Sequence, residues 1–135
     1  MNVQGLRAGD LMHTGVETIS EACTLAEATR LMHDRHVSSL VVERENESDA
    51  LGIVTRKDVV VALLSDGHGM EPLLVRDVMS KPAITVPPEL AISHCIRLMR
   101  TAGVRRMPVE KDGRLVGILS NSDLFRWLAG QLGGA

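Results

Sequence analysis

The sequence contains few aromatic residues and little net charge. Of its 135 residues one is Trp, one is Phe and none is Tyr, and the formal net charge is −2. Proteins that bind single-stranded nucleic acid usually stack the bases on several aromatic side chains. A nearly neutral chain also has no general attraction to nucleic acid or to an anionic membrane. We therefore expect no nucleic-acid partner.

Cysteines and long apolar runs are also scarce. Neither Cys23 nor Cys95 lies in a CxxC pair, as expected for reduced thiols in the cytoplasm. No stretch approaches the roughly 18–20 apolar residues that a membrane-spanning helix needs, and residues 1–10 contain no apolar run typical of a signal peptide. We expect a soluble, cytoplasmic protein with no membrane partner.

The motifs of common enzyme and metal sites are missing. The chain has no GxGxxG, Walker loop, HExxH or nucleophile elbow. His33 and His36 lie three residues apart on an expected helix, but no cluster of Cys, Asp or Glu completes a metal site with them. We interpret them, like His13, His68 and His94, as surface histidines. We predict a protein that is not an enzyme, with no catalytic residue, no metal and no cofactor.

The chain contains an internal duplication. A shift of 67 positions places Asp10–Met12 on Asp77–Met79, and a shift of 65 places Asp58 on Asp123. The order of matching features is the same in both copies, so a chance alignment is improbable. We predict one repeat over residues 1–66, a Gly-rich connection over 67–73 and a second repeat over 74–135.

Each repeat has the pattern of a βαββα unit. Apolar residues recur at helical spacing, Thr24-x-x-Glu27 forms a capping-box pattern, and Asp112-Gly113 predicts a hairpin turn. The predicted elements are 16–19, 25–34, 39–43, 50–54 and 56–64 in the first repeat, and 83–86, 90–101, 107–110, 115–119 and 121–132 in the second.

The predicted fold class is α+β, with two βαββα units packed with pseudo-twofold symmetry. A right-handed crossover places the first strand of each unit parallel to a hairpin strand, which leaves both helices on one face of a three-stranded sheet. A unit of about 60 residues is only marginally stable alone. We therefore expect the two sheets to pack face to face, with a cleft on each side of the twofold axis.

A repeated motif joins the last strand of each unit to its last helix. It places a hydroxyl at the strand end and a carboxylate three residues later, as Thr55 with Asp58 and as Ser120 with Asp123. One interpretation is a helix cap. The other is a ligand site, in which free N–H groups attract phosphate, the hydroxyl donates, the acid accepts from ribose hydroxyls and Lys57 adds positive charge. Both interpretations stay open.

The segment before the hairpin differs between the repeats. The second repeat has Arg105 and Arg106 where the first has Ser38 and Ser39. Neighbouring side chains in an extended segment point to opposite faces, so at most one of the two arginines can face a cleft. The alternative is a pair of solvated surface charges. If one arginine does face a cleft, the two clefts differ in their preference for anions.

The repeated segments resemble a known family. LAEATRLM, HVSSLVVE and GIVTRKDVV, followed by RLMRTAGVRRMPVEKDGRLVGILSNSDL, resemble a tandem pair of cystathionine-β-synthase (CBS) domains of the stand-alone bacterial type, from about Leu6 to Leu128. The resemblance implies a regulatory module that binds AMP, ADP or ATP, and less often S-adenosylmethionine or NAD. It also implies a homodimer formed through the helices. Trp127 is then either an interface residue or part of the core.

The resemblance also assigns residues to two clefts. The stronger cleft would join Thr55, Lys57 and Asp58 with Ile84, Thr85, Arg105, Arg106 and Pro108, and Asp58 would hold the ribose. The weaker cleft would join Thr18, Ser38 and Ser39 with Ser120 and Asp123. There Val41 replaces the family's Pro and Ser122 replaces a possible Lys. An unidentified protein partner would read the change that the ligand causes. The alternative function is a dimerisation or interaction scaffold with vestigial clefts.

Overall fold

The computed structural model describes residues 3–65 and 72–133 of the chain, and most of the predicted connection over 67–73 lies outside them. The chain forms two compact units. We call residues 17–83 the central unit, and residues 1–16 with 84–135 the terminal unit. No helix within the described ranges has the length and apolar character needed to cross a lipid bilayer.

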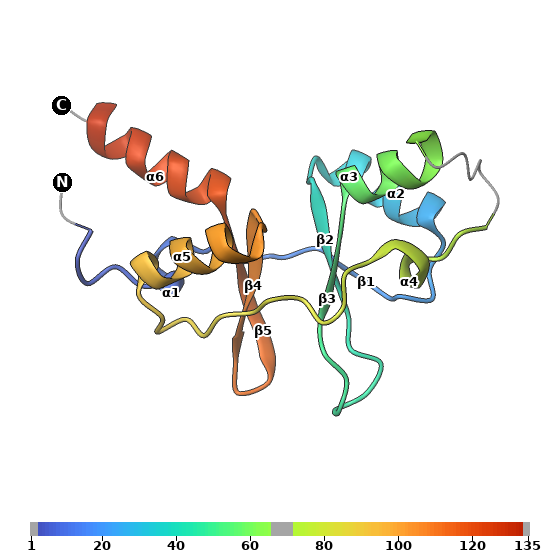
Figure 1. Cartoon of the computed structure of the whole chain (residues 1–135), viewed down its shortest axis with the longest axis horizontal. Helices are drawn as coiled ribbons and strands as arrows, with labels where there is room; N and C mark the ends of the chain where they lie inside the picture. The colour runs from blue at the N-terminus through green and yellow to red at the C-terminus, as the bar shows by residue number, and fades with distance from the viewer. Residues whose placement is uncertain (1–2, 66–71, 134–135) are drawn as a thin grey trace. The chain divides into compact units, whose positions relative to one another are not determined.

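The central unit is a three-stranded sheet covered by helices. Its elements are β1 (Thr18–Ile19), α2 (Leu25–Arg35), β2 (Ser39–Val42), β3 (Gly52–Thr55), α3 (Arg56–Val60), its π-helical continuation η1 (Val61–Ser65) and α4 (Val75–Val78). The strand order is β1-β2-β3, with β1 parallel and β3 antiparallel to β2. Helices α2 and α3 lie on the same face of this sheet (Figure 1). The predicted parallel crossover and helix placement are confirmed here.

The core of the central unit lies between β2 and α2. Leu40 and Val42 alternate along β2 onto the face that packs against α2, and both are 0% exposed. Helix α2 begins at a cap in which the Thr24 hydroxyl accepts a hydrogen bond from Glu27 N at 3.1 Å. It ends at His36, whose left-handed backbone (φ 55°) stops the helix. Cap and apolar spacing together explain why the sequence predicted this helix well.

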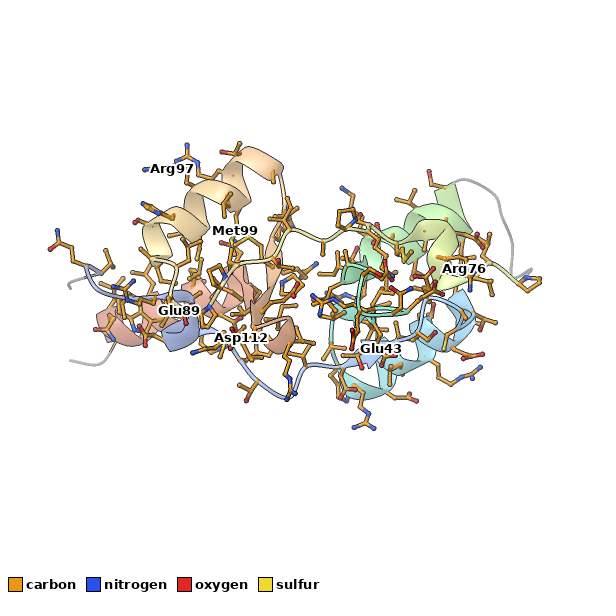
Figure 2. All side chains as sticks on the ribbon, turned by 90° about the horizontal axis from the view of Figure 1, so that it is seen from below. Glu43, Arg76, Glu89, Arg97, Met99 and Asp112 are labelled. Carbon is orange, nitrogen blue, oxygen red and sulfur yellow. The ribbon has the colours of Figure 1, made fainter. Side chains whose placement is uncertain are left out.

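The terminal unit has a corresponding set of helices and a longer hairpin, which forms a two-stranded sheet. Its elements are α1 (Ala8–Leu11), α5 (Ile92–Ala102), β4 (Arg106–Lys111), β5 (Arg114–Ser120) and α6 (Asn121–Gly133). Asp112 and Gly113 both have positive φ, as the predicted tight hairpin turn requires. Helix α5 buries Met99 in the core, while Arg97 extends away from the ribbon (Figure 2).

The predicted first strand of the second repeat, residues 83–86, is wrong as an element. Only Val86 pairs with the hairpin, in a single parallel bridge to Val109. Pro108 of β4 has no backbone N–H to donate to Ile84 O, whereas Val41, its counterpart in the central unit, donates from its N to Glu17 O at 3.1 Å. The ladder therefore ends after one residue.

The compact units do not coincide with the predicted boundaries of the repeats. Helix α1 packs in the terminal unit, where Ala8 N donates to Leu90 O at 2.8 Å, and α4 packs in the central unit, where Val75 N donates to Cys23 O at 2.9 Å. Both Ala8 and Val75 are 0% exposed. The first segment of the first repeat, with α1, thus covers the start of α5, and the first segment of the second repeat, with α4, covers the start of α2.

Candidate functional site

The β3–α3 corner of the central unit holds Thr55 and Asp58. Thr55 N donates to Asp58 Oδ2 at 2.8 Å, and Asp58 N donates to Thr55 Oγ1 at 3.2 Å. Asp58 is half-buried, and Lys57 beside it is exposed. The second carboxylate oxygen of Asp58, Oδ1, has no hydrogen-bond partner among the described residues. This corner is a capped helix start with unused acceptor capacity.

The β5–α6 corner of the terminal unit contains the same cap in a more crowded setting. Asp123 accepts hydrogen bonds from Ser120 N at 2.9 Å, Ser120 Oγ at 2.8 Å and Arg126 Nη1 at 3.1 Å. The Nδ1 atom of His13 lies 3.0 Å from Oδ2 and 3.1 Å from Oδ1. The Asp123 side chain is only 5% exposed.

The surroundings of Asp123 favour its ionised form. Burial alone would raise its pKa, but the hydrogen bonds from Ser120 and His13 outweigh burial and hold the pKa below its usual range. Because an ionised carboxylate only accepts hydrogen bonds, the contact requires a proton on Nδ1 of His13. His13 was predicted to be a surface histidine, and its side chain is 53% exposed; the contact with Asp123 was not predicted.

The capping interpretation of the repeated motif is therefore confirmed at both corners. A cap uses only part of a carboxylate, so it does not exclude a ligand at Asp58. At Asp123 the cap, His13 and Arg126 together use both carboxylate oxygens as hydrogen-bond acceptors.

The segments before the hairpins lie beside these corners. In the central unit Arg56 N donates to Ser38 O at 3.0 Å, and Ser39 pairs with Thr55 across the sheet. In the terminal unit Asn121 N donates to Arg105 O at 2.8 Å, and Arg106 pairs with Ser120. The repeat motifs thus bring corner and pre-hairpin segment together within each unit.

The remaining predicted site residues are placed as follows. Ile84 is 38% exposed, Thr85 is half-buried and Pro108 is buried. The Thr18 hydroxyl donates to Glu43 Oε1 at 2.9 Å, and Glu43 is exposed (Figure 2). Each predicted cleft draws residues from both units, so the assembly of either cleft stays a prediction.

A charged cluster that the sequence did not predict lies in the central unit. Lys81 Nζ is 2.5 Å from Glu21 Oε1 and 2.5 Å from Asp49 Oδ2, and the Lys81 side chain is 11% exposed. Burial opposes the charge of Lys81, but the hydrogen bonds to Asp49 and Glu21 outweigh it and raise the lysine pKa. Glu21, Asp49 and Glu45 could together hold a metal ion. The ammonium group already neutralises two of them, so we assign no metal there.

Acid is expected to weaken this cluster. The hydrogen bond from Lys81 lowers the pKa of Asp49 from 3.8 to about 2, so the ionised form is favoured in the folded chain. The resulting stabilisation is fully present above the unfolded pKa and is lost as the pH falls from about 4 through about 2. Urea unfolding between pH 6 and pH 2.5 should show a smaller acid-induced loss in Asp49→Asn than in the unmodified chain. Glu47→Gln, a change at an exposed carboxylate, should retain the full loss.

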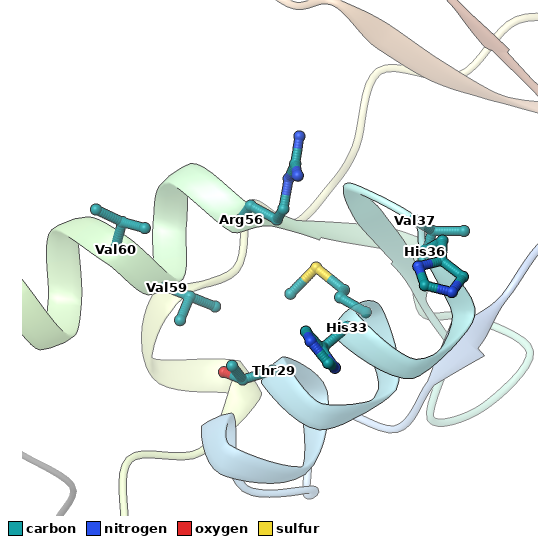
Figure 3. Close-up of a pocket in the computed structure, with 8 residues that line it drawn as sticks. Thr29, His33, His36, Val37, Arg56, Val59 and Val60 are labelled. Atoms are coloured by element: carbon teal, nitrogen blue, oxygen red, sulfur yellow. The ribbon is translucent and has the colours of Figure 1, made fainter.

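An open groove lies on the helical side of the central unit (Figure 3). It has a volume of about 430 Å³ and runs between α2 and α3. Its lining is mainly apolar, with His33, His36 and Arg56 among the lining residues. Val60, which lines the groove, is 52% exposed, and Leu64, further along in η1, is 79% exposed. An apolar surface of this kind is typical of a protein contact.

Comparison with known protein families decides the classification. The family model described as the CBS domain matches residues 8–65 and again residues 75–130, and each match contains one strand–helix corner. The chain belongs to the CBS domain family. Pairs of CBS domains are typically regulatory ligand-binding modules. The predicted resemblance to a tandem CBS pair is confirmed.

Three similar proteins illustrate the range of CBS proteins. The protein MK0525 of Methanopyrus kandleri is 30% identical over 125 residues, which span 92% of this chain and 63% of that protein. A hexameric CBS-CP12 protein from bloom-forming cyanobacteria is 37% identical with a TM-score of 0.85, over 89% of this chain and 66% of that one. The CBS domain pair of protein MJ0100 was solved in complex with 5′-methylthioadenosine and S-adenosyl-L-methionine. It is 22% identical with a TM-score of 0.78, over 90% of this chain and 98% of that one. This chain therefore spans slightly less than two thirds of the first two proteins.

Proposed function

We propose that this CBS pair is a regulatory module that binds AMP, ADP or ATP without catalysis, and S-adenosylmethionine or NAD with lower preference. The observation that carries the proposal is the carboxylate of Asp58. Its Oδ2 atom caps α3, while Oδ1 has no hydrogen-bond partner among the described residues. A half-buried carboxylate with a free oxygen is suited to accept hydrogen bonds from the two hydroxyls of a ribose.

The other predicted residues supply the remaining parts of such a ligand site. Thr55, the exposed Lys57 and one of the two arginines, Arg105 or Arg106, would bind phosphate. The adenine ring would lie against Ile84, Thr85 and Pro108. This assembly requires the two units to face each other as the repeat predicts. The second cleft, with Thr18, Ser38 and Ser39 opposite Ser120 and Asp123, is the weaker candidate.

The comparisons support an adenosine ligand. The CBS pair of MJ0100 was solved with two ligands, and both contain adenosine. Adenosine is also common to AMP, ADP, ATP and NAD. A ligand regulates by binding one shape of the protein more tightly than another. We propose that a protein partner in the cytoplasm reads this difference.

A thermal-shift panel of AMP, ADP, ATP, S-adenosylmethionine and NAD tests the proposal. A ligand present at about 100 times its dissociation constant stabilises the folded chain by about 2.7 kcal/mol, which raises the melting temperature by roughly 5–10 °C. Inorganic phosphate at the same concentration is the control for non-specific anion binding and should give no comparable shift. Hydrolysis of ATP during the measurement would contradict the absence of catalysis.

A second candidate function is a dimerisation scaffold whose clefts bind nothing. The α2–α3 groove and the exposed side chains of Val60 and Leu64 favour it, since they form an apolar surface suited to a second copy of the chain. We propose a homodimer under either function. The scaffold would be favoured if none of the five ligands shifts the melting temperature while light scattering gives the mass of a dimer.

A further inference from the structure

The two strand–helix corners differ in how much of their carboxylate is available. A carboxylate has about four lone-pair sites for hydrogen bonds. Asp123 is given hydrogen bonds by Ser120 N, Ser120 Oγ, His13 and Arg126, so its capacity is filled. Asp58 receives only the bond from Thr55 N among the described residues. Three donors therefore make the difference, namely Ser120 Oγ, His13 and Arg126, and Ser120 has a counterpart at the other corner in Thr55. The two side chains to explain are His13 and Arg126.

The repeat shows that neither of these side chains has a counterpart at Asp58. His13 corresponds to Ser80, since each exchanges two backbone hydrogen bonds with the last strand of its unit, His13 with Ile118 and Ser80 with Ile53. Arg126 corresponds to Val61 under the shift of 65 positions. The backbone is therefore alike at both corners. The side chains of His13 and Arg126 use the remaining acceptor capacity of Asp123, and neither has a counterpart at Asp58.

The backbone of His13 is held firmly in place. His13 N and Ile118 N donate to each other's carbonyl oxygens at 3.0 Å. A Cβ atom at Gly117 would lie 2.9 Å from the His13 carbonyl oxygen, which shows how closely this segment packs against β5. His13 can therefore release Asp123 only by rotating its side chain and not by moving its backbone.

We propose that the side chain of His13, assisted by Arg126, occupies the hydrogen-bonding position at Asp123 that a ligand in the second cleft would need. This inference rests on the proposed function, because it assigns the Asp123 carboxylate the ribose-binding role proposed for Asp58. A ribose hydroxyl would have to displace a charge-assisted hydrogen bond at a carboxylate that is 5% exposed. The chain therefore binds its adenosine ligand at the Asp58 corner alone.

Calorimetric titration with AMP tests the proposal through the number of sites. The unmodified chain should bind about one AMP per chain, and the double variant His13→Ser with Arg126→Val, which copies the Asp58 corner, should bind about two. The matched control His33→Ser removes an exposed histidine that does not contact Asp123, and it should still bind one. Two sites in the unmodified chain, or one site in a folded double variant, would overturn the proposal.

The reverse exchange gives a second test that does not depend on the folding of the double variant. Ser80→His places an imidazole at the position that corresponds to His13, so it should weaken AMP binding at least about 10-fold. Ser80→Ala is its control and should bind like the unmodified chain. Unchanged binding by Ser80→His would contradict the inference. If no form of the chain binds AMP or any other ligand of the panel, the proposed function itself fails.

Discussion

Replacing Leu40 with alanine is expected to lower the free energy of unfolding by about 3 kcal/mol. Leu40 lies in β2, is 0% exposed and packs in the cluster that joins the sheet to α2. Shortening it removes apolar contacts and leaves a cavity, because the flanking strands β1 and β3 hold β2 in place on both sides. Guanidinium unfolding followed by circular dichroism measures the loss.

A matched substitution separates burial from residue type. Leu132→Ala removes the same atoms from a side chain that is 70% exposed, so its effect should stay within about 0.5 kcal/mol. Equal effects of the two substitutions would contradict the position of the core between β2 and α2.

Replacing Asp58 with asparagine is expected to lower the affinity for AMP about 10- to 100-fold. The neutral amide retains an oxygen that can accept the hydrogen bond from Thr55 N, so the cap of α3 is retained. What is lost is the charge that strengthens hydrogen bonds from the ribose hydroxyls, and such bonds contribute about 1.5–3 kcal/mol. Isothermal titration calorimetry measures the change.

Asp77→Asn is the matched control for this variant. Asp77 lies in the same unit and caps α4 in the same way, since its Oδ2 accepts a hydrogen bond from Leu74 N at 2.8 Å. It belongs to neither predicted cleft. Its replacement should therefore leave the affinity for AMP within about 2-fold of the unmodified value. A similar loss in both variants would mean that Asp58 acts only through the stability of the unit.

The sequence predicted the four longer helical segments and both hairpins within a few residues because the signals for them are local, whereas the short helices α1 and α4 were not predicted. Helix α2 was predicted over residues 25–34 and is observed over Leu25–Arg35, since its cap at Thr24 and its apolar spacing both lie within the segment. The turn at Asp112 and Gly113 depends on the backbone of two residues. The capping pairs Thr55–Asp58 and Ser120–Asp123 are also local, since the acid follows the hydroxyl by three positions.

The features that escaped prediction depend on contacts between distant parts of the chain. His13 and Asp123 are 110 positions apart, and Lys81 is 60 positions from Glu21. Both pairs exist because the first segment of each repeat packs in the compact unit formed by the rest of the other repeat. Nothing in a short window of sequence indicates which repeat such a segment joins. Within their own stretches of sequence, neither His13 nor Lys81 belongs to a motif that indicates these contacts.

A crystal structure of the chain grown with AMP is the most direct test of the proposed ligand site. We predict that the ribose hydroxyls lie within hydrogen-bond distance of Asp58 Oδ1, while Oδ2 still caps α3 and Asp123 still contacts His13. The contradicting result is a nucleotide bound elsewhere, for example in the α2–α3 groove, with the Asp58 carboxylate still bonded to Thr55 alone.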